Sequence, residues 1–410
     1  MIQDPPPSIL PDTGIATLLA RRIDVHHLSR GMVVGVTDVA GHRFIAQGHS
    51  DASMTNPVDA STLFEIGSIT KVFTALVLAD MADKGEVRLD EPVQDLLPNG
   101  VRVPARNGRP ITLLDLASHR SGLPRMPANF GLAEWTDPER PYTPDLLYAF
   151  LADHELARTP GDVNVYSNLG YGLLGHALSR RADIPYEALV RSRFLDPLAM
   201  HRTVIEVPQH LASAVATGHD DALDAVPAWR FGAMEGAGAF RSSAADMLLF
   251  VDALRTPSTS PLATAIATLK TPLKEGGLGY RTDHPDGSLL LSHTGGTGGF
   301  RSYLGCLPAW DRGVIVLSNA LTEITADLGL HILDPRFRLM WHRTAVPVDP
   351  AQFLRLTGRY RLTPTQIFDV TADDQGLLVK LGEQNTCRVF PIVCSRPPTG
   401  ASSTNAWARS

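Results

Sequence analysis

Three short segments of this chain carry side chains that together could perform serine chemistry. They are Ser68-Ile69-Thr70-Lys71, Tyr166-Ser167-Asn168 and His293-Thr294-Gly295. In chain order they supply a hydroxyl nucleophile with an amine nearby, a phenol with an amide, and a strand edge containing glycine. A serine activated in this way attacks a carbonyl and passes through a covalent acyl-enzyme. Each segment is weak evidence alone, but the set indicates acyl transfer from a carbonyl substrate.

Ser68 follows a glycine and precedes a helical apolar pattern, so it is expected at or near a helix N-terminus. Free backbone N–H groups there favour an oxyanion or alkoxide. A plain N-cap serine is the alternative, and on local evidence it is the better interpretation. Lys71 lies one helical turn further on, about 5–6 Å away between Cβ atoms. Burial would lower the pKa of its amine and suit it to accept a proton, whereas a solvated helix lysine is the alternative.

Tyr166 and Asn168 fall in a predicted loop that runs from Pro160-Gly161-Asp162 into a helix. A phenol beside a lysine can shuttle a proton, because the neighbouring cation favours the phenolate. The Asn168 amide offers both a donor and an acceptor, enough to hold the lysine and a substrate amide. A buried tyrosine and a turn asparagine are the ordinary alternatives.

The glycine-rich segment from His293 to Gly299 closes a predicted strand. Glycines have no Cβ, so a substrate could lie along the strand edge. The main-chain N–H of Gly296 could pair with that of Ser68 as an oxyanion hole, in which one donor contributes about 3 kcal/mol to the transition state. A tight hairpin is the alternative. A phosphate cradle is rejected, because no Gly-Lys-Ser/Thr follows.

Ser50 is the competing nucleophile. Gly48-His49-Ser50-Asp51-Ala52 resembles a nucleophile elbow, but the loop-like Met54-Thr55-Asn56-Pro57 follows where that motif needs a helix. We therefore expect Ser50 to take no part in catalysis. The sequence contains no His-Glu-x-x-His, no paired zinc ligands and no dinucleotide fingerprint, so it predicts no metal and no cofactor.

The elements that must position these residues follow a simple order. Strand patterns lie at 33–39, 43–48, 289–293, 301–304 and 313–318. Helical patterns lie at 69–84, 146–151, 171–178 and 244–254, and Gly85 is a stop signal after the first. Strands thus begin and end the main body, and helices fill its middle. This order predicts a sheet whose strands come from both ends, with a helical subdomain inserted between them.

Composition restricts the broad class. The 410 residues have 44% hydrophobic and 20% charged content and a net charge of -6, which indicates a globular, soluble chain of two or three subdomains. Neither nucleic acid nor an anionic membrane is expected as a partner. Three scattered cysteines do not make a disulfide framework. The first thirty residues contain neither a signal peptide nor a membrane span, so the chain as written is expected in the cytoplasm, or in the periplasm if a leader was removed.

The motifs resemble those of the penicillin-recognising serine hydrolases: class C β-lactamases, DD-peptidases and family VIII esterases. Phe64–Lys71, Leu116–Pro124, Pro160–Tyr171 and His293–Arg301 carry the resemblance, and a related Ser-x-x-Lys set occurs in penicillin-binding proteins. It covers about residues 15–345. It implies an α/β (α+β) fold, in which an antiparallel sheet flanked by helices carries an inserted all-helical subdomain. We expect a main domain at 1–350, with its α/β part at about 15–80 and 240–345 and its helical insert at about 81–239.

The resemblance also implies roles for matching residues. Ser68 would be the acylated nucleophile, Lys71 its base, and Tyr166 the group that passes a proton to the leaving group. Asn168 would position Lys71 and the substrate. The remaining implied contacts are the oxyanion-hole N–H groups of Ser68 and Gly296, His293 as a further catalytic residue, and Thr294, Gly295 and Arg301 at the substrate.

His293 is a departure, because class C β-lactamases carry lysine at the matching position. A neutral imidazole attracts a carboxylate less than an ammonium does, and its charge depends on pH. The His-Thr-Gly form resembles some DD-peptidases and D-amino-acid peptidases, whereas many family VIII esterases have Trp-Gly-Gly. Arg301 could supply a replacement charge, and a surface arginine is the alternative. Activity on a carboxylate-bearing substrate is expected to fall as pH rises through the titration of His293.

The C-terminal residues 351–410 form a second departure. Strand patterns lie at 356–360, 368–370 and 376–381, with a fourth candidate at 389–393, and the polar segment 395–405 is expected to be disordered. The pattern is similar to the start of a lipocalin-like barrel, but closing a barrel takes about eight strands. We therefore expect a partial β appendage. An unpaired strand edge makes a homodimer, or docking of the tail on the main body, a hypothesis.

The sequence thus predicts a serine hydrolase of β-lactamase or penicillin-binding type that cleaves a small-molecule amide (a β-lactam or D-peptide) or a small ester through a Ser68 acyl-enzyme. A family VIII-type carboxylesterase and an acyltransferase use the same residues and stay open as alternatives. A peptide- or β-lactam-binding protein without turnover is the alternative from another class.

Overall fold

A computed structural model gives the fold of this chain. It describes residues 7–130, 142–257, 260, 262–270, 278–279, 287–321, 325–340, 354–361, 367–373, 376–381 and 386–389. The chain divides into two compact units, Met1–Leu339 and Met340–Ser410. Within the described ranges, no helix combines the length and the apolar character that crossing a bilayer requires.

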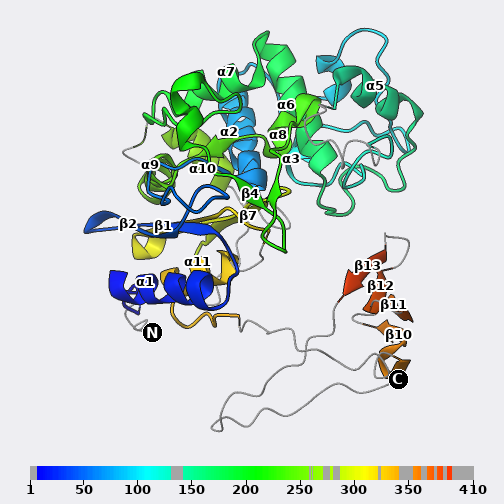
Figure 1. Ribbon diagram of the computed structural model, residues 1–410. Coiled ribbons are helices and arrows are strands. Elements are labelled where there is room, and N and C mark those ends of the chain that lie inside the picture. Colours follow the sequence, from blue (N-terminus) through cyan, green and yellow to red (C-terminus); the bar gives the residue numbers. More distant parts are fainter. Residues whose placement is uncertain are drawn as a thin grey trace. The chain divides into compact units, whose positions relative to one another are not determined.

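A five-stranded antiparallel sheet forms the body of the first unit (Figure 1). In spatial order its strands are β2 (Gly41–Gly48), β1 (Gly31–Asp38), β9 (Arg312–Ser318), β8 (Arg301–Leu307) and β7 (Leu291–Gly296). β1 pairs with β9 from Met32↔Ser318 to Thr37↔Gly313, so the two ends of this unit meet in one sheet. The prediction that strands from both ends share a sheet is confirmed.

Helices cover both faces of this sheet, because successive strand residues point to opposite sides. Val34 and Val36 of β1 face a cluster that includes Ile15 of α1 (Asp12–Ala20) and Leu328 of α11 (Thr325–Leu333). Val33 faces the larger cluster, which holds the residues of α9 (Ala244–Arg255). Figure 1 shows α1 and α11 on one side of the sheet and α9 on the other. β1 is buried along almost its whole length, as a central strand must be.

The middle of the first unit is mostly helical, as the sequence predicts. Its helices and helical turns are η2 (Gly67–Ile69), α2 (Thr70–Asp83), η3 (Val93–Leu96), α3 (Leu113–Ala117), α5 (Pro144–Asp153), α6 (Asn168–Ala182), α7 (Tyr186–Val190), η4 (Arg191–Leu195), η5 (Gln209–Ala214), η6 (Gly232–Met234) and α8 (Glu235–Gly238). Two short strand pairs lie among these elements. They are β3 (Phe64–Glu65) with β6 (Arg241–Ser242), and β4 (Gly218–His219) with β5 (Ala225–Val226). The remaining elements are η1 (Arg21–Val25), α10 (Ala263–Lys270) and η8 (Pro308–Trp310).

The helix α2 corrects one expectation. The sequence predicts a helix with one apolar face, but α2 is buried on nearly all sides, and its buried residues include Thr70, Lys71 and Thr74. A helix buried all round belongs to the interior of a large domain. It is covered by α6, α8 and α10, which pack against it. Lys71 is therefore an interior residue, and Gly85 follows the helix with a left-handed φ of 71° as predicted.

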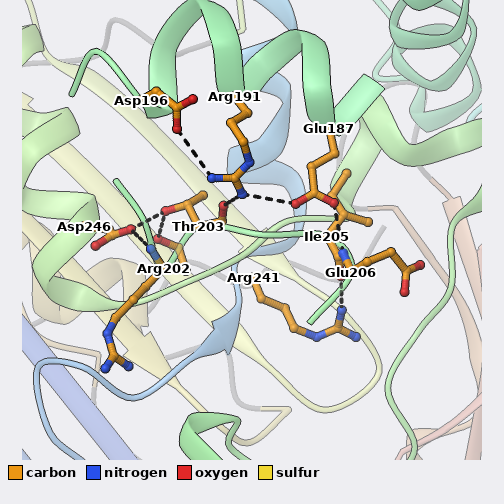
Figure 2. A network of polar contacts seen from close by, with 10 residues as sticks. Glu187, Arg191, Asp196, Arg202, Thr203, Ile205, Glu206, Arg241 and Asp246 are labelled. Atoms are coloured by element: carbon orange, nitrogen blue, oxygen red, sulfur yellow. Dashed lines mark hydrogen bonds and ion pairs between the residues drawn. The ribbon is translucent and has the colours of Figure 1, made fainter. Parts of the chain in front are cut away.

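A polar network holds the segment between η4 and β6 (Figure 2). Arg191 donates to Glu187 and to the carbonyl oxygen of Thr203. Asp246 accepts from the Thr203 hydroxyl and from the backbone N–H of Arg202. Because these bonds join α7, η4 and α9 to one loop, the loop has a fixed place beside β6.

β6 in turn supports the strand that leads to Ser68. Arg241 of β6 donates to the carbonyl oxygen of Ile205 at 2.8 Å and to Glu65 of β3 at 3.0 Å. Glu65 is buried, which raises the pKa of its carboxyl although Arg241 acts in the opposite direction. It also accepts from the backbone N–H of Trp229. The two strands thereby fix the backbone just before η2.

The second unit contains a four-stranded antiparallel sheet. Its strands are β10 (Gly358–Arg361), β11 (Ile367–Asp373), β12 (Gly376–Leu381) and β13 (Thr386–Val389). The fourth strand lies before the predicted 389–393 and shares only Val389 with it. Residues 390–410, with the predicted disordered tail, lie outside the described residues. The lipocalin-like character and the homodimer stay predictions.

Candidate active site

Ser68 lies in the 3-10 turn η2, immediately before α2. Gly67 ahead of it has a left-handed φ of 50°, and a Cβ there would lie 2.5 Å from the amide nitrogen of Gly296. Only glycine allows this approach. The backbone of Gly67, next to Ser68, therefore lies directly against Gly296 at the end of β7. The oxyanion hole formed by the N–H groups of Ser68 and Gly296 stays a prediction. The N-cap position of α2 is Ile69 and has no side-chain cap, so the interpretation of Ser68 as a plain N-cap is wrong.

Gly295 leaves room for β7 and β8 to lie against Ile66, the residue just before η2. The Ser302 hydroxyl of β8 donates to the carbonyl oxygen of Ile66 at 2.8 Å. A Cβ at Gly295 would lie 1.9 Å from that same oxygen and 2.2 Å from the Ser302 Oγ. Gly295 thus acts through the backbone next to Ser68. The observed strand is longer than the predicted one: β7 ends at Gly296, so His293 lies within the strand and not at its end.

Gly295→Ala is therefore expected to destabilise the fold, by about 1–3 kcal/mol in free energy of unfolding, because the new methyl group has no room. Chemical denaturation followed by circular dichroism measures this change. Gly14→Ala in α1 is the matched control, since its Cβ would meet a flexible Leu10 side chain at 3.2 Å. Equal denaturation midpoints for Gly295→Ala and the unmodified chain would show that β7 does not hold Ile66 as described.

Lys71 is completely buried beneath Ser68. Its Nζ lies 3.0 Å from Ser68 Oγ, 2.9 Å from Asn168 Oδ1 and 2.6 Å from the carbonyl oxygen of Ala237. Burial, and next the positive charge of Arg125, hold the pKa of the Lys71 amine well below the ordinary lysine value. Both effects favour the free amine over the charged form.

The donors and acceptors around that amine show what it can do. A neutral lysine amine has two N–H groups and one lone pair. Asn168 Oδ1 and the Ala237 carbonyl can only accept, so they take the two N–H groups. In this neutral form the lone pair is left for the third neighbour, Ser68 Oγ at 3.0 Å, to which the protonated amine would instead donate. This is the arrangement in which an amine removes the proton of an attacking serine.

Tyr166 and Asn168 are placed by the start of α6. Ser167 caps this helix: its Oγ accepts from the N–H of Gly170 at 2.8 Å and donates to the carbonyl oxygen of Pro124 at 2.6 Å. The Tyr166 ring centroid lies 5.0 Å from Lys71 Nζ. Tyr166, from the middle of the chain, therefore lies close to Lys71 of the early helix.

A second phenol nearby, Tyr171, does not have the same role. It is fully buried, its hydroxyl donates to the carbonyl oxygen of Ala117 at 2.6 Å, and burial raises its pKa further above the ordinary range. Tyr171 is thus held as a neutral phenol, so the prediction of a proton shuttle stays with Tyr166.

His293 and Arg301 occupy the sheet side of the site. His293 Nδ1 donates to the carbonyl oxygen of Thr294 at 2.6 Å. Arg301 is half-buried and lies against Gly296, where a Cβ would come within 2.3 Å of its Nη1. Arg301 is therefore partly covered by β7, and it lines the cavity. β7 is an outer strand of the sheet, as a strand edge for substrate requires.

These residues surround one cavity of about 880 Å³. Its walls include most of the predicted site residues, namely Ser68, Tyr166, Asn168, His293, Thr294, Gly295, Gly296 and Arg301. Lys71 lies beneath Ser68 and does not line the cavity. Ser50 lies elsewhere, and its hydroxyl donates to the carbonyl oxygen of Asn56. The structure thus places residues of all three motifs around one cavity, and Ser50 lies outside it.

The cavity also has lining residues that sequence reasoning missed. They include Arg125, Met126, Phe130, Trp229, Arg230, Phe231 and Met234. Arg125 directly follows the Ser121-Gly122-Leu123-Pro124 stretch, which carries part of the family resemblance, so a signal for it was present. Trp229 and Phe231 lie in a segment without a regular pattern, and no signal marks them.

Other reactive groups lie apart from this site. Cys306 is a buried free thiol, and burial raises its pKa to about 12. Such a thiol is inert. The described part of the chain contains no group of three or more His, Cys, Asp or Glu side chains that could hold a metal ion.

Comparisons with known proteins agree with this geometry. The family model described as Beta-lactamase matches residues 18–334. The D-alanyl-D-alanine-carboxypeptidase/endopeptidase AmpH of Escherichia coli is 28% identical over 321 residues, which cover 72% of this chain and 80% of that protein. A class C beta lactamase from Rhodobacter sphaeroides has a TM-score of 0.65 and 27% identity, over 78% of this chain and 98% of its own. A beta-lactamase/D-alanine carboxypeptidase from Yersinia pestis has a TM-score of 0.67 and 27% identity, over 80% and 97%.

Proposed function

The chain belongs to the beta-lactamase family and is a serine hydrolase, and from this premise we propose that it cleaves an amide bond in a carboxylate-bearing D-peptide or β-lactam. The observation that carries the proposal is the contact of Lys71 Nζ with Ser68 Oγ, with two carbonyl-type acceptors holding the amine on its other sides.

The proposed reaction uses each of these groups in turn. Ser68 Oγ attacks the substrate carbonyl while Lys71 takes its proton, and the N–H groups of Ser68 and Gly296 bind the oxyanion. Tyr166 then passes a proton to the leaving nitrogen as the C–N bond breaks. In the second half, a water molecule gives up a proton to the same groups and attacks the acyl-enzyme, which releases the acid and restores Ser68.

The charge of the cavity supports an anionic substrate. Arg125, Arg230, Arg301 and His293 line it, and none of the described lining residues has a carboxylate. A cleft with one sign of charge raises the local concentration of the opposite charge. Trp229 and Phe231 add an apolar wall, which suits an acyl portion with few charges. Two relatives are named carboxypeptidases for D-alanyl peptides or D-alanine, which supports the D-peptide.

An acyl-D-Ala-D-Ala peptide is therefore expected to be a better substrate as its free acid than as its C-terminal amide. A hydrogen bond to a charged group contributes about 1.5–3 kcal/mol, and the amide has no carboxylate to form it, so its kcat/KM is expected to be about ten- to a hundredfold lower. Steady-state hydrolysis of the acid, the amide and a penicillin, measured side by side, tests this. Arg301→Gln should reduce the difference between acid and amide.

The same assay with a nitrophenyl ester tests the carboxylesterase alternative. Equal kcat/KM for acid and amide, together with turnover of the ester alone, would contradict the proposed substrate class. Acyl transfer and binding without turnover use the same residues, and no feature of the described residues favours them.

A further inference from the structure

The segment from His119 to Arg125 is attached to the backbone that presents Tyr166. The N–H of Ser167 donates to His119 Nδ1 at 3.1 Å, and the Ser167 hydroxyl donates to the carbonyl oxygen of Pro124. The N–H of Asn168 donates to the carbonyl oxygen of Arg125 at 3.0 Å. Arg125 therefore has a backbone position that is fixed relative to both Tyr166 and Asn168.

The side chain of Arg125 turns toward the reacting groups. Its Cζ lies 5.2 Å from the centroid of the Tyr166 ring, which is also 5.0 Å from Lys71 Nζ. Both contacts fall within the range of a cation over an aromatic face. The two side chains differ in one respect. Lys71 must lose its charge to act as a base, whereas the guanidinium of Arg125 stays charged throughout the pH range of the protein.

The other charged and titratable groups around Lys71 and Tyr166 come from four directions. The segment after α3 adds His119, whose ring centroid lies 4.5 Å from that of Tyr166, with the two rings tilted by 35°. α6 adds Tyr171, which is held neutral. α8, which packs against α2 and α6, begins with Glu235, whose carboxyl has its pKa raised to about 7 by burial and by Glu187 and Glu206. β7 and β8 add His293 and Arg301 across the cavity, and Arg230 lines its rim.

We propose that Arg125 is a positioning residue for acylation: its guanidinium supplies the fixed positive charge that keeps Lys71 as a free amine and favours the phenolate of Tyr166. This inference rests on the proposed function of Ser68 and Lys71. Once Lys71 has taken the Ser68 proton, two cations lie beside one phenol ring. Their repulsion favours the onward transfer of that proton through Tyr166 to the leaving group. In agreement with this, the positive charge of Arg125 lowers the pKa of Lys71.

The test is the rate of Ser68 acylation by the neutral ester p-nitrophenyl acetate, followed as the burst of nitrophenol release from pH 5 to pH 10. A neutral ester removes any role of Arg125 in binding a substrate carboxylate. In Arg125→Met, the rise of the rate with pH is expected about half a unit to one unit higher, because the lysine amine is then protonated up to a higher pH. At neutral pH the rate should fall about three- to tenfold, and at pH 10 it should approach that of the unmodified chain.

Four further variants make the result specific. Arg125→Lys keeps a positive charge and should restore the original profile. Arg88→Met removes an exposed arginine that pairs with the exposed Asp90, and it should leave the profile unchanged. Glu235→Gln removes a nearby carboxyl whose pKa is raised to about 7, and it should also leave the rise in place. Arg125→Gln carries the test if the Met variant does not fold.

Several outcomes would overturn the inference. One is an Arg125→Met or Arg125→Gln profile that is lower by the same factor at every pH, which indicates a structural role alone. Another is a failure of folded Arg125→Lys to restore the rise. A third is a rise that moves with Glu235→Gln and not with Arg125. Absence of any burst in the unmodified chain is distinguishable from these, because it contradicts the proposed function itself.

Discussion

Ser68→Ala is expected to remove turnover of every substrate and to leave the protein folded. The hydroxyl is the group of the site that would form the covalent intermediate, so its removal closes the acyl-enzyme route as a whole. In a serine hydrolase of another fold, removal of the nucleophile costs about 10⁶-fold in kcat, and we expect a decrease of at least about 10⁴-fold here. Steady-state hydrolysis of the best substrate measures it.

The fold should survive because Ser68 is half-buried and its hydroxyl bonds to the side chain of Lys71. Ser50→Ala is the matched control, since Ser50 is also a serine shortly after a glycine but lies outside the cavity. Circular dichroism should give the same spectrum and melting temperature within a few degrees for both variants. Substantial turnover in folded Ser68→Ala would exclude Ser68 as the nucleophile.

Lys71→Met is expected to lower the rate of acylation by about 10²- to 10⁴-fold, the usual contribution of general base catalysis. Methionine has a similar length and fills the buried space, but it has no lone pair strong enough to accept the Ser68 proton. Stopped-flow measurement of the burst phase gives this rate directly. Lys84→Met is the control, because Lys84 follows the same helix and is exposed. An unchanged burst in Lys71→Met would assign the base to another group.

The same variant should change how stability depends on pH. The pKa of Lys71 is low in the folded chain, so the unfolded chain binds one more proton as pH falls below the ordinary lysine value of about 10.4. Stability therefore falls with falling pH over that interval, until the folded-state lysine is protonated as well. Lys71→Met removes this contribution, and the slope of unfolding free energy against pH just below about pH 10 becomes less positive. An unchanged slope would mean that Lys71 is charged in the folded protein.

The sequence was sufficient for the parts of the site that depend on local spacing. Ser68 and Lys71 are three residues apart in a helical pattern, which places them on one face whatever surrounds them. The strand patterns at both ends of the main body were also local, and their pairing as β1 with β9 follows from the need to bury both. Ser167 as the cap of α6 was equally within reach, because a serine before an apolar helical run is a known start signal.

Other features depend on contacts between distant residues and could not be predicted. The burial of α2 on nearly all sides arises from α6, α8 and α10, and the composition of α2 alone does not reveal how many neighbours cover it. Trp229 enters the cavity because its backbone N–H donates to Glu65, which lies 164 residues away in the chain. The place of Arg125 over Tyr166 depends in the same way on bonds from His119 and Arg125 to the start of α6.

The most direct test is the intact mass of the protein after brief mixing with a penicillin, followed by peptide mapping. Opening of the lactam ring by Ser68 adds the whole mass of the penicillin, and the adduct should map to the peptide that contains Ser68. Ser68→Ala should gain no mass, and an acyl-D-Ala-D-Ala peptide should give the acyl adduct without its terminal residue. A folded protein that hydrolyses these substrates with no adduct on Ser68, or with one on another residue, would contradict the account.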